Sequence, residues 1–300
     1  MRIGAVDIGT NTMRLLIADV VGDDVRWLDR RTTVTGLGSG VDASGRLDDA
    51  AIGRTIDVLA GYGAALEKAG VEGARVVATS ATRDAANRAA FLDLAEQAIG
   101  VRPDIISGDE EAALAFYGAT RAAPGPAPFV VVDVGGGSTE FVFGGDAPEY
   151  LMSVDIGSVR LTDRALGGRP PDPDELASAR DLAADLLAEV ALPGPPGTCL
   201  GVAGTFTSLS AISQDLPVYD PGRVHGSVLT VTRIAELVLY LSLLSVGETA
   251  AIPSLDPARA PVILAGALVA EEAVRRCAVS EIVVSEHDSL DGVAIGVARS

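Results

Sequence analysis

The chain has 300 residues, a length at which two domains are the prior expectation. Hydrophobic residues make up 48% of it and charged residues 21%, which excludes a disordered or collagen-like chain. The formal net charge of -18 disfavours a nucleic-acid partner bound through a basic face.

Two further sequence features bear on location. The longest apolar run, Pro261–Ala270, is well short of the roughly 18 residues that a membrane span requires, so we expect no membrane partner. Asp7 interrupts the N-terminal apolar stretch early, which does not fit a secretory signal. We therefore expect a cytoplasmic protein.

Cysteine and histidine are scarce in the sequence. Cys199 and Cys277 lie far apart with no C-x-x-C spacing, and His225 and His287 are the only histidines of the sequence. The sequence therefore argues against a zinc site and favours two buried, reduced thiols.

An internal repeat opens each half of the chain. Ile3–Thr12 and Val130–Ser138 both contain an apolar strand, an aspartate, a branched apolar residue, glycine, small residues and a hydroxyl. The offset from Asp7 to Asp133 is 126 residues (133 − 7). Each copy leads into two further strand-like segments joined by tight turns, which are Met13–Val20 and Val25–Val34 in the first half and Phe141–Phe143 and Glu149–Val154 in the second.

Helical and strand patterns alternate after these opening strands. The first half shows a helix over Asp48–Ala69 stopped by Gly70, a strand at Arg75–Ala78, a helix near Asp84–Ile99, a strand at Ile105–Ile106 and a helix over Asp109–Arg121. The second shows a helix from about Asp174 to Val190, a strand at Thr198–Val202, helices near Phe206–Ser213, Val231–Leu244 and Pro257–Cys277, and a strand at Glu281–Ser285.

The proline-rich segment Pro124–Pro128 separates these two halves and is typical of a short, stiff connection. We therefore expect domains at 1–124 and 125–300. Alternating strands and helices after an antiparallel meander predict an α/β fold with a mixed, mainly parallel sheet in each domain. Two such domains with corresponding loops should enclose a cleft.

The repeated aspartates are the leading candidates for chemistry. Asp7 and Asp133 each end an apolar strand before a glycine-rich turn, and a carboxylate beside free backbone N–H groups suits a metal-bridged phosphate. One such turn is more often structural, but two copies related by a repeat favour a functional interpretation. The candidate phosphate-binding residues are Gly9, Thr10, Asn11, Thr12, Gly135, Gly136, Gly137 and Ser138, with Thr139 as a further donor.

Further candidates follow other strands. The alternation after the second loop directs Glu140 toward the loop that follows Asp133, although a solvated strand edge is the alternative. Arg83 falls in the first turn of an expected helix, where a cation is unfavourable unless an anion binds there. Gly204 and Thr205 join a strand to a helix, which makes a third anion site.

Five segments taken in order carry a resemblance to a known family: Asp7–Thr12, Ala81–Ala85, Ser107–Ala112, Asp133–Glu140 and Gly204–Thr205. Together they resemble the exopolyphosphatase and guanosine pentaphosphate phosphatase (Ppx/GppA) family, over essentially the whole chain. That family belongs with acetate and sugar kinases, Hsp70 and actin, so the resemblance implies two ribonuclease H-like domains around a central cleft.

The resemblance also implies roles for individual residues. Glu111 matches the general base for the attacking water, and Arg83 matches an arginine that contacts phosphate. Asp133 and Glu140 match acidic residues that organise Mg²⁺ and the water. From its place before the first glycine-rich turn, Asp7 is expected to be a further metal ligand, and Mn²⁺ is an alternative ion.

The sequence departs from the family pattern in two places. Longer relatives continue into helical C-terminal domains, whereas this chain ends at Ser300, so short polyphosphate chains are the expected substrates. Ser285–Gly292 replaces the Gly-Leu-Arg-Glu-Gly form of relatives, which removes a basic residue and adds acids. His225 also fits the family pattern, but a structural histidine is an equally good interpretation.

The main expectation is therefore a Mg²⁺-dependent exopolyphosphatase that releases orthophosphate from polyphosphate ends. The same loops could instead hold pppGpp, which would make the protein a guanosine pentaphosphate 5′-phosphohydrolase. An ATP-dependent kinase and a silent polyphosphate or nucleotide sensor are less favoured alternatives, the latter because Glu111 is present. A homodimer is the general expectation for a protein of this kind.

Overall fold

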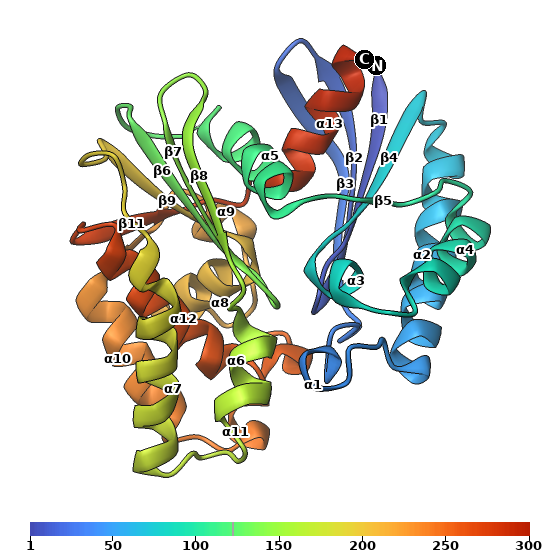
Figure 1. Ribbon diagram of the computed structural model, residues 1–300. Coiled ribbons are helices and arrows are strands. Elements are labelled where there is room, and N and C mark those ends of the chain that lie inside the picture. Colours follow the sequence, from blue (N-terminus) through green and yellow to red (C-terminus); the bar gives the residue numbers. More distant parts are fainter. Residues whose placement is uncertain (122) are drawn as a thin grey trace. The chain divides into compact units, whose positions relative to one another are not determined.

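The computed structural model describes residues 1–121 and 123–300 and divides into two compact units (Figure 1). Unit 1 comprises Met1–Arg121 together with Ser289–Ser300, and unit 2 comprises Ala122–Asp288.

Unit 1 contains a mixed sheet with the strand order β3-β2-β1-β4-β5. The antiparallel part is the opening meander, and β4 and β5 then add in parallel to β1, as the sequence pattern predicts. The strands are β1 (Arg2–Ile8), β2 (Thr12–Val21), β3 (Asp24–Val34), β4 (Gly73–Ala78) and β5 (Asp104–Ile105).

Helices cover both faces of this sheet because successive strand residues point to opposite sides. Leu15 packs in one cluster with Leu59 of α2, and its neighbour Leu16 packs in another with Leu290 of α13. The Asp48 side chain caps α2 by accepting from the Ala51 N–H, and Gly70 ends it in the left-handed region. The helices are α1 (Val41–Ser44), α2 (Asp49–Ala69), α3 (Ser80–Asp84), α4 (Arg88–Ile99), α5 (Gly108–Thr120) and α13 (Ser289–Arg299).

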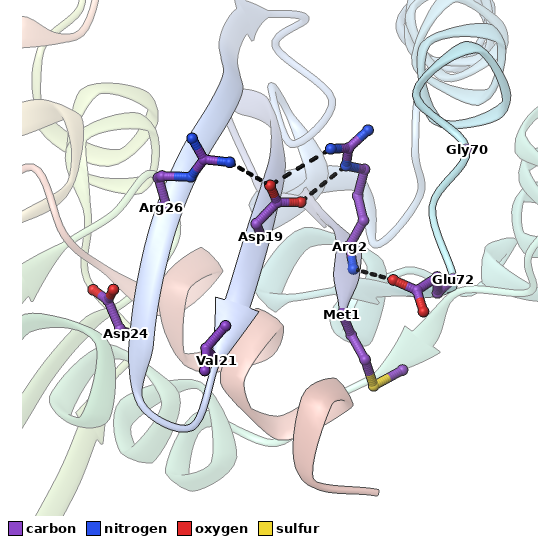
Figure 2. Close-up of a pocket in the computed structure, with 8 residues that line it drawn as sticks. All are labelled: Met1, Arg2, Asp19, Val21, Asp24, Arg26, Gly70 and Glu72. Carbon is purple, nitrogen blue, oxygen red and sulfur yellow. Dashed lines mark hydrogen bonds and ion pairs between the residues drawn. The ribbon is translucent and has the colours of Figure 1, made fainter.

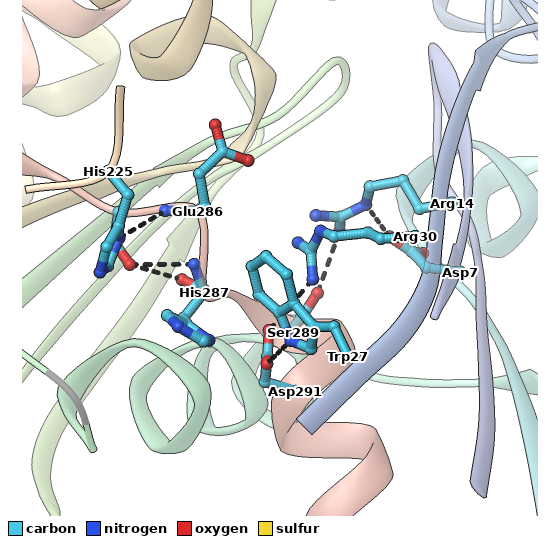
Figure 3. A network of polar contacts seen from close by, with 10 residues as sticks. Asp7, Arg14, Trp27, Arg30, His225, Glu286, His287, Ser289 and Asp291 are labelled. Carbon is cyan, nitrogen blue, oxygen red and sulfur yellow. Dashed lines mark hydrogen bonds and ion pairs between the residues drawn. The ribbon is translucent and has the colours of Figure 1, made fainter. Parts of the chain in front are cut away.

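The C-terminal helix α13 differs from the sequence-based domain division. A boundary at 124/125 assigns 289–300 to the second domain, whereas α13 packs on β1, β2 and α5 of unit 1. Its Asp291 carboxylate is 1% exposed, accepts a 2.7 Å hydrogen bond from Trp27 Nε1 and lies 3.2 Å from Arg30 Nη1 (Figure 3). The chain therefore returns to unit 1 after completing unit 2.

Unit 2 also contains a mixed sheet, in the order β10-β11-β9-β6-β7-β8. β6, β7 and β8 form the antiparallel meander, and β9 and β11 extend it in parallel. The strands are β6 (Phe129–Val134), β7 (Thr139–Gly144), β8 (Pro148–Val154), β9 (Thr198–Val202), β10 (Val228–Thr230) and β11 (Glu281–Val284).

One hydrophobic cluster of unit 2 joins alternate residues of β6, such as Val130 and Val132, to the helices. The helical segments are α6 (Ser158–Ala165), α7 (Pro173–Leu186), η1 (Leu187–Glu189), α8 (Ala203–Ser213), α9 (Pro221–Val224), α10 (Val231–Ser242), α11 (Val246–Ala250), η2 (Pro257–Arg259) and α12 (Ile263–Arg276). Among the described residues, no helix has the length and apolar character needed to span a bilayer.

The candidate motifs lie at corresponding sheet edges in the two units. In unit 1 they follow the parallel strands β1, β4 and β5, and in unit 2 they follow β6 and β9. The carboxyl ends of parallel strands meet at one edge of a sheet, and ligands of α/β proteins bind outside that edge. The topology therefore brings the motifs of each unit to its ligand-binding edge.

Candidate functional site

Asp7 is the penultimate residue of β1, and its carboxylate is buried, 3% exposed, and paired with a cation. Its partner across the antiparallel register is Arg14 of β2. The Arg14 Nε atom donates a 3.0 Å hydrogen bond to Asp7 Oδ2, and the Arg14 Nη2 atom contacts the same oxygen and Ser289 Oγ (Figure 3). The guanidinium neutralises this carboxylate, which makes Asp7 a weaker metal ligand than an acid paired with another acid.

The first glycine loop is held by its carbonyl groups. The Thr10 carbonyl accepts from the Gly38 N–H at 2.7 Å, and the Asn11 carbonyl accepts from the N–H groups of Thr35 and Gly36 at 3.0 Å each. A trans peptide directs its C=O and N–H to opposite sides, so these bonds turn the following N–H groups away from the bracing segment. Gly38 must be glycine here, because a Cβ would lie 2.3 Å from Thr10 Cγ2.

Arg83 and Glu111 come together at the carboxyl ends of β4 and β5. Arg83 Nη1 donates to the Ile106 carbonyl at 3.1 Å and lies 4.0 Å from Glu111 Oε2. Ser107 caps α5 by accepting from the Glu110 N–H at 3.1 Å, so the Glu111 carboxylate lies in the first turn of that helix. A carboxylate held beside a guanidinium can accept a proton from a water that attacks a bound phosphate.

Arg83 does not lie in the first turn of a helix, contrary to the prediction from the sequence. The chain forms a short α3 and then an extended residue at Ala85, so Arg83 lies in the last turn of a helix and not in the first. A cation is favourable at that end of the dipole. Arg83 remains a candidate because of its contact with Glu111.

Asp133 and Glu140 form a pair of acids in unit 2. They are partners in the β6–β7 register and are 5% and 1% exposed, so both carboxylates lie on one face of the sheet. Ser153 of β8, the register partner of Glu140, donates a 2.8 Å hydrogen bond from its hydroxyl to Glu140 Oε1. This is the place where the alternation of β7 predicts the Glu140 side chain.

The second glycine loop rests on the first turn of α6. The Gly135 carbonyl accepts from the Ser158 N–H at 2.9 Å, and the Gly136 carbonyl accepts from the Val159 N–H at 2.8 Å. Gly157 allows this approach, because a Cβ on it would lie 2.6 Å from the Gly136 carbonyl. As in unit 1, the carbonyl side of the loop is occupied by protein, which leaves the N–H side for an anion.

Gly204 and Thr205 begin α8 directly after β9. The Thr205 hydroxyl donates to the Val134 carbonyl at 2.9 Å, so its proton fastens α8 to the end of β6. The Arg259 guanidinium lies against Gly204, where a Cβ would be 2.0 Å from Nη1. The structure therefore gives Thr205 a bracing contact and places a cation beside Gly204.

The two histidines of the chain contact each other in unit 2, with ring centroids 5.1 Å apart. His225 Nδ1 accepts from the Glu286 N–H at 3.3 Å, which fixes the loop after β11 (Figure 3). The Glu286 carboxylate accepts from the Tyr219 hydroxyl. Burial raises the pKa of Tyr219 well above its ordinary range, and the neighbouring Glu286 raises it further. These contacts hold the His225 ring against His287 and the loop after β11.

A separate surface cavity of about 610 Å³ lies at the other end of β1, among Met1, Arg2 and Asp19 (Figure 2). Asp19 pairs there with Arg2 at 2.9 Å and with Arg26 at 2.6 Å. Since Asp7 ends the strand that Arg2 begins, this cavity is not part of the candidate site.

The candidate site offers few side-chain ligands for a metal ion. Within the described ranges, 1–121 and 123–300, no group of three or more His, Cys, Asp or Glu side chains could hold a metal. Mg²⁺ commonly takes one or two carboxylates and completes its shell with water and substrate phosphates. The buried pair of Asp133 and Glu140 fits that requirement.

The comparisons with known proteins identify the family. The model of the Ppx/GppA phosphatase family matches residues 16–300. The chain belongs to the Ppx/GppA phosphatase family. It is 41% identical to exopolyphosphatase 2 of Mycobacterium tuberculosis over 315 aligned positions, which cover 99% of this chain and 98% of that protein.

Solved structures of similar proteins agree with this Ppx/GppA assignment. An exopolyphosphatase-like protein matches with a TM-score of 0.95 and 33% identity, over 100% of this chain and 99% of its own. The Ppx/GppA enzyme of Aquifex aeolicus matches with a TM-score of 0.82 and 31% identity, over 99% of both chains. The resemblance inferred from the sequence motifs and the α/β fold with two mixed sheets are therefore confirmed.

Three residues of the candidate site were not anticipated: Arg14, Ser153 and Arg160, whose Nε donates to the Gly137 carbonyl of the second glycine loop at 2.8 Å. Arg14 could have been found from the first hairpin, since residues equidistant from a turn face each other. To predict the contact of Ser153 with Glu140, one must know the register of the β7–β8 hairpin, which contains an irregularity. Arg160 lies on α6, a helix that was not predicted from the sequence.

Proposed function

We propose that this protein is a Mg²⁺-dependent exopolyphosphatase that removes the terminal phosphate of inorganic polyphosphate. The observation that carries the proposal is the buried pair of Asp133 and Glu140 beside a glycine loop whose N–H side is left for an anion. The 41% identity to exopolyphosphatase 2 over 99% of the chain favours polyphosphate as the substrate.

In this proposal Asp133 and Glu140 hold the metal ion. When bound, Mg²⁺ supplies positive charge that offsets the charge of the phosphoryl oxygens. The N–H groups of the loop at Gly135–Ser138 bind the phosphate oxygens by hydrogen bonds, in the manner of a backbone nest. Asp7, neutralised by Arg14, joins the end of β1 to β2. The N–H groups of the loop at Gly9–Thr12 are also proposed to bind phosphate.

Glu111 acts as the general base and Arg83 as a phosphate ligand. The water oxygen forms a bond to the terminal phosphorus while the bridging P–O bond breaks, and the Glu111 carboxylate takes the water proton. The products are orthophosphate and a chain one phosphate shorter. General-base assistance of this kind contributes roughly 10²- to 10⁴-fold to the rate.

The proposal is tested by phosphate release from short polyphosphate, long polyphosphate, pppGpp and ATP in the presence of Mg²⁺. Glu111→Gln should lower turnover of polyphosphate by about 10²-fold or more. The matched control is Glu110→Gln, because Glu110 lies next in the chain and pairs with Arg75 at 2.7 Å on the exposed side of α5.

Three outcomes would overturn parts of the proposal. Turnover of pppGpp alone would retain the site and replace the substrate. Phosphate transfer from ATP to an acceptor without hydrolysis would indicate a kinase. Equal activity in Glu111→Gln and wild type would remove Glu111 as the base.

A further inference from the structure

The first turn of α6 is bonded to the glycine loop through both the backbone and a side chain. The Ser158 and Val159 N–H groups bond the Gly135 and Gly136 carbonyls, and the Arg160 N–H also bonds the Gly136 carbonyl, at 3.1 Å. The Arg160 side chain then adds a 2.8 Å hydrogen bond from Nε to the Gly137 carbonyl. Three successive carbonyls of the loop are thus engaged by one helical turn.

The consequence follows from peptide geometry. In a trans peptide the carbonyl of one residue and the N–H of the next point in opposite directions. Bonding the Gly137 carbonyl to Arg160 therefore directs the Ser138 N–H away from α6, in the same way that the two preceding bonds direct the N–H groups of Gly136 and Gly137. Of these three N–H groups, that of Ser138 depends on a side chain for its direction.

The loop that precedes Ser138 is a run of three glycines, so the direction of the Ser138 N–H needs an external contact to fix it. Glycine has a larger conformational freedom than other residues, so Gly135–Gly137 does not hold its own peptide planes in place. The first two planes are fixed by N–H groups of α6, which the helix presents whatever its side chains are. The third plane is fixed by a charge-assisted bond, a stronger class than a neutral one.

We propose that Arg160 is a positioning residue for phosphate binding: it holds the Gly137–Ser138 peptide so that the Ser138 N–H faces the substrate phosphate. This inference rests on the proposed function of the loop. Arg160 acts through the peptide that it holds, and its guanidinium contributes by orienting a backbone donor.

The test uses Arg160→Gln and Arg160→Lys in the full chain, with Arg164→Gln as the matched control. Arg164 lies one turn later on α6 and is exposed. Losing the charge-assisted bond should raise KM for tripolyphosphate and the inhibition constant of inorganic phosphate together, by about 10-fold or more. The turnover number should change by less than about 3-fold, because the base and the carboxylates stay in place.

Arg160→Lys keeps a cationic donor and should recover part of the affinity for phosphate. A structural role alone would lower the fraction of folded protein, which reduces kcat and leaves the KM and the phosphate inhibition constant unchanged. That pattern, or equal shifts in Arg164→Gln, would overturn the inference. If Arg160→Gln does not fold, the Arg160→Lys constants decide by the same criterion.

Failure of the proposed function can be distinguished from failure of the inference about Arg160. If the wild type releases no phosphate from polyphosphate, the proposed function fails, and binding of inorganic phosphate is then measured by calorimetry. A dissociation constant about 10-fold higher in Arg160→Gln than in wild type would still support Arg160 as a positioning residue. An equal constant, or no phosphate binding by the wild type, would overturn that role as well.

Discussion

Arg14 and Glu140 occupy the same position in the two copies of the internal repeat. Each is the cross-strand partner of the aspartate that ends the first strand of its unit, Asp7 for Arg14 and Asp133 for Glu140. The repeat offset of 126 residues (140 − 14) relates them directly. The Asp7–Arg14 pair is therefore neutral, whereas the Asp133–Glu140 pair consists of two acids and is negative. The acid pair suits a divalent cation and the neutralised pair does not.

Glu140→Gln should raise the Mg²⁺ concentration for half-maximal activity by about 10-fold or more, because the amide removes one of two negative charges from the proposed metal site. The measurement is phosphate release against Mg²⁺ concentration at saturating polyphosphate. Glu149→Gln, at an exposed position of β8, is the control and should leave the Mg²⁺ dependence unchanged. An unaltered Mg²⁺ dependence in Glu140→Gln would remove Glu140 from the metal site.

Ser153→Ala should produce a smaller change in the same direction, about 3- to 10-fold in half-maximal Mg²⁺, because the 2.8 Å hydrogen bond orients the Glu140 carboxylate. Ser153→Thr retains a hydroxyl and should recover part of the loss. In a double-mutant cycle with Glu140→Gln, the serine substitution should have little added effect, since its partner is already changed. Fully additive effects would indicate that Ser153 acts independently of Glu140.

Much of the fold and part of the site follow from local patterns. The strand over Thr198–Val202 appears as β9 with the expected bounds, and Gly70 ends α2 as predicted. Strand alternation directs Glu140 toward the loop after Asp133, and the β6–β7 register places the two acids opposite each other. These features are determined by residues close to one another in the sequence, so a single sequence was enough to predict them.

The remaining features depend on tertiary contacts. α13 carries Gly292, which lowers helix propensity, yet the helix needs this glycine because a Cβ would lie 2.2 Å from the Leu114 carbonyl of α5. The extended residue Ala85, which separates α3 from α4, has no breaker signal such as glycine or proline. α6 is short and is fixed by bonds to the loop at Gly135–Gly137. Local sequence patterns contain no information on such contacts. For this reason α6, α13 and the position of Arg83 were not predicted from the sequence.

Asp291→Asn should destabilise the protein by about 3 to 5 kcal/mol, because it leaves the Arg30 guanidinium beside a neutral amide in a buried position. The measurement is urea unfolding followed by the fluorescence of Trp27, the one tryptophan of the chain and a direct neighbour of Asp291. Asp29→Asn is the control, since the Arg31–Asp29 pair is on the same strand with side chains 47% and 33% exposed and should contribute at most about 1 kcal/mol. Equal effects of the two substitutions would contradict a stabilising role of the buried Asp291–Arg30 pair.

Tyr62 should make the protein less stable in alkali. It is 4% exposed, and its hydroxyl lies 3.1 Å from Thr33 Oγ1 and donates to the Met13 carbonyl at 3.3 Å. Burial raises the pKa of Tyr62 above its ordinary value of 10.0, so the folded state keeps the proton where the unfolded state releases it. The stability that the neutral phenol provides is complete below pH 10 and is lost as the pH rises from there through the raised pKa.

The Tyr62→Phe variant removes this dependence. Between pH 10 and the raised pKa, the free energy of unfolding of the wild type should fall more steeply than that of Tyr62→Phe, by about 1.4 kcal/mol per pH unit for one proton. Urea unfolding at pH 8, 9.5 and 10.5 measures the two slopes. Tyr240→Phe, on the exposed side of α10, is the matched control and should retain the wild-type slope. Parallel curves for Tyr62→Phe and wild type would show that Tyr62 does not ionise differently in the two states, because the slope difference counts the protons that this side chain releases on unfolding.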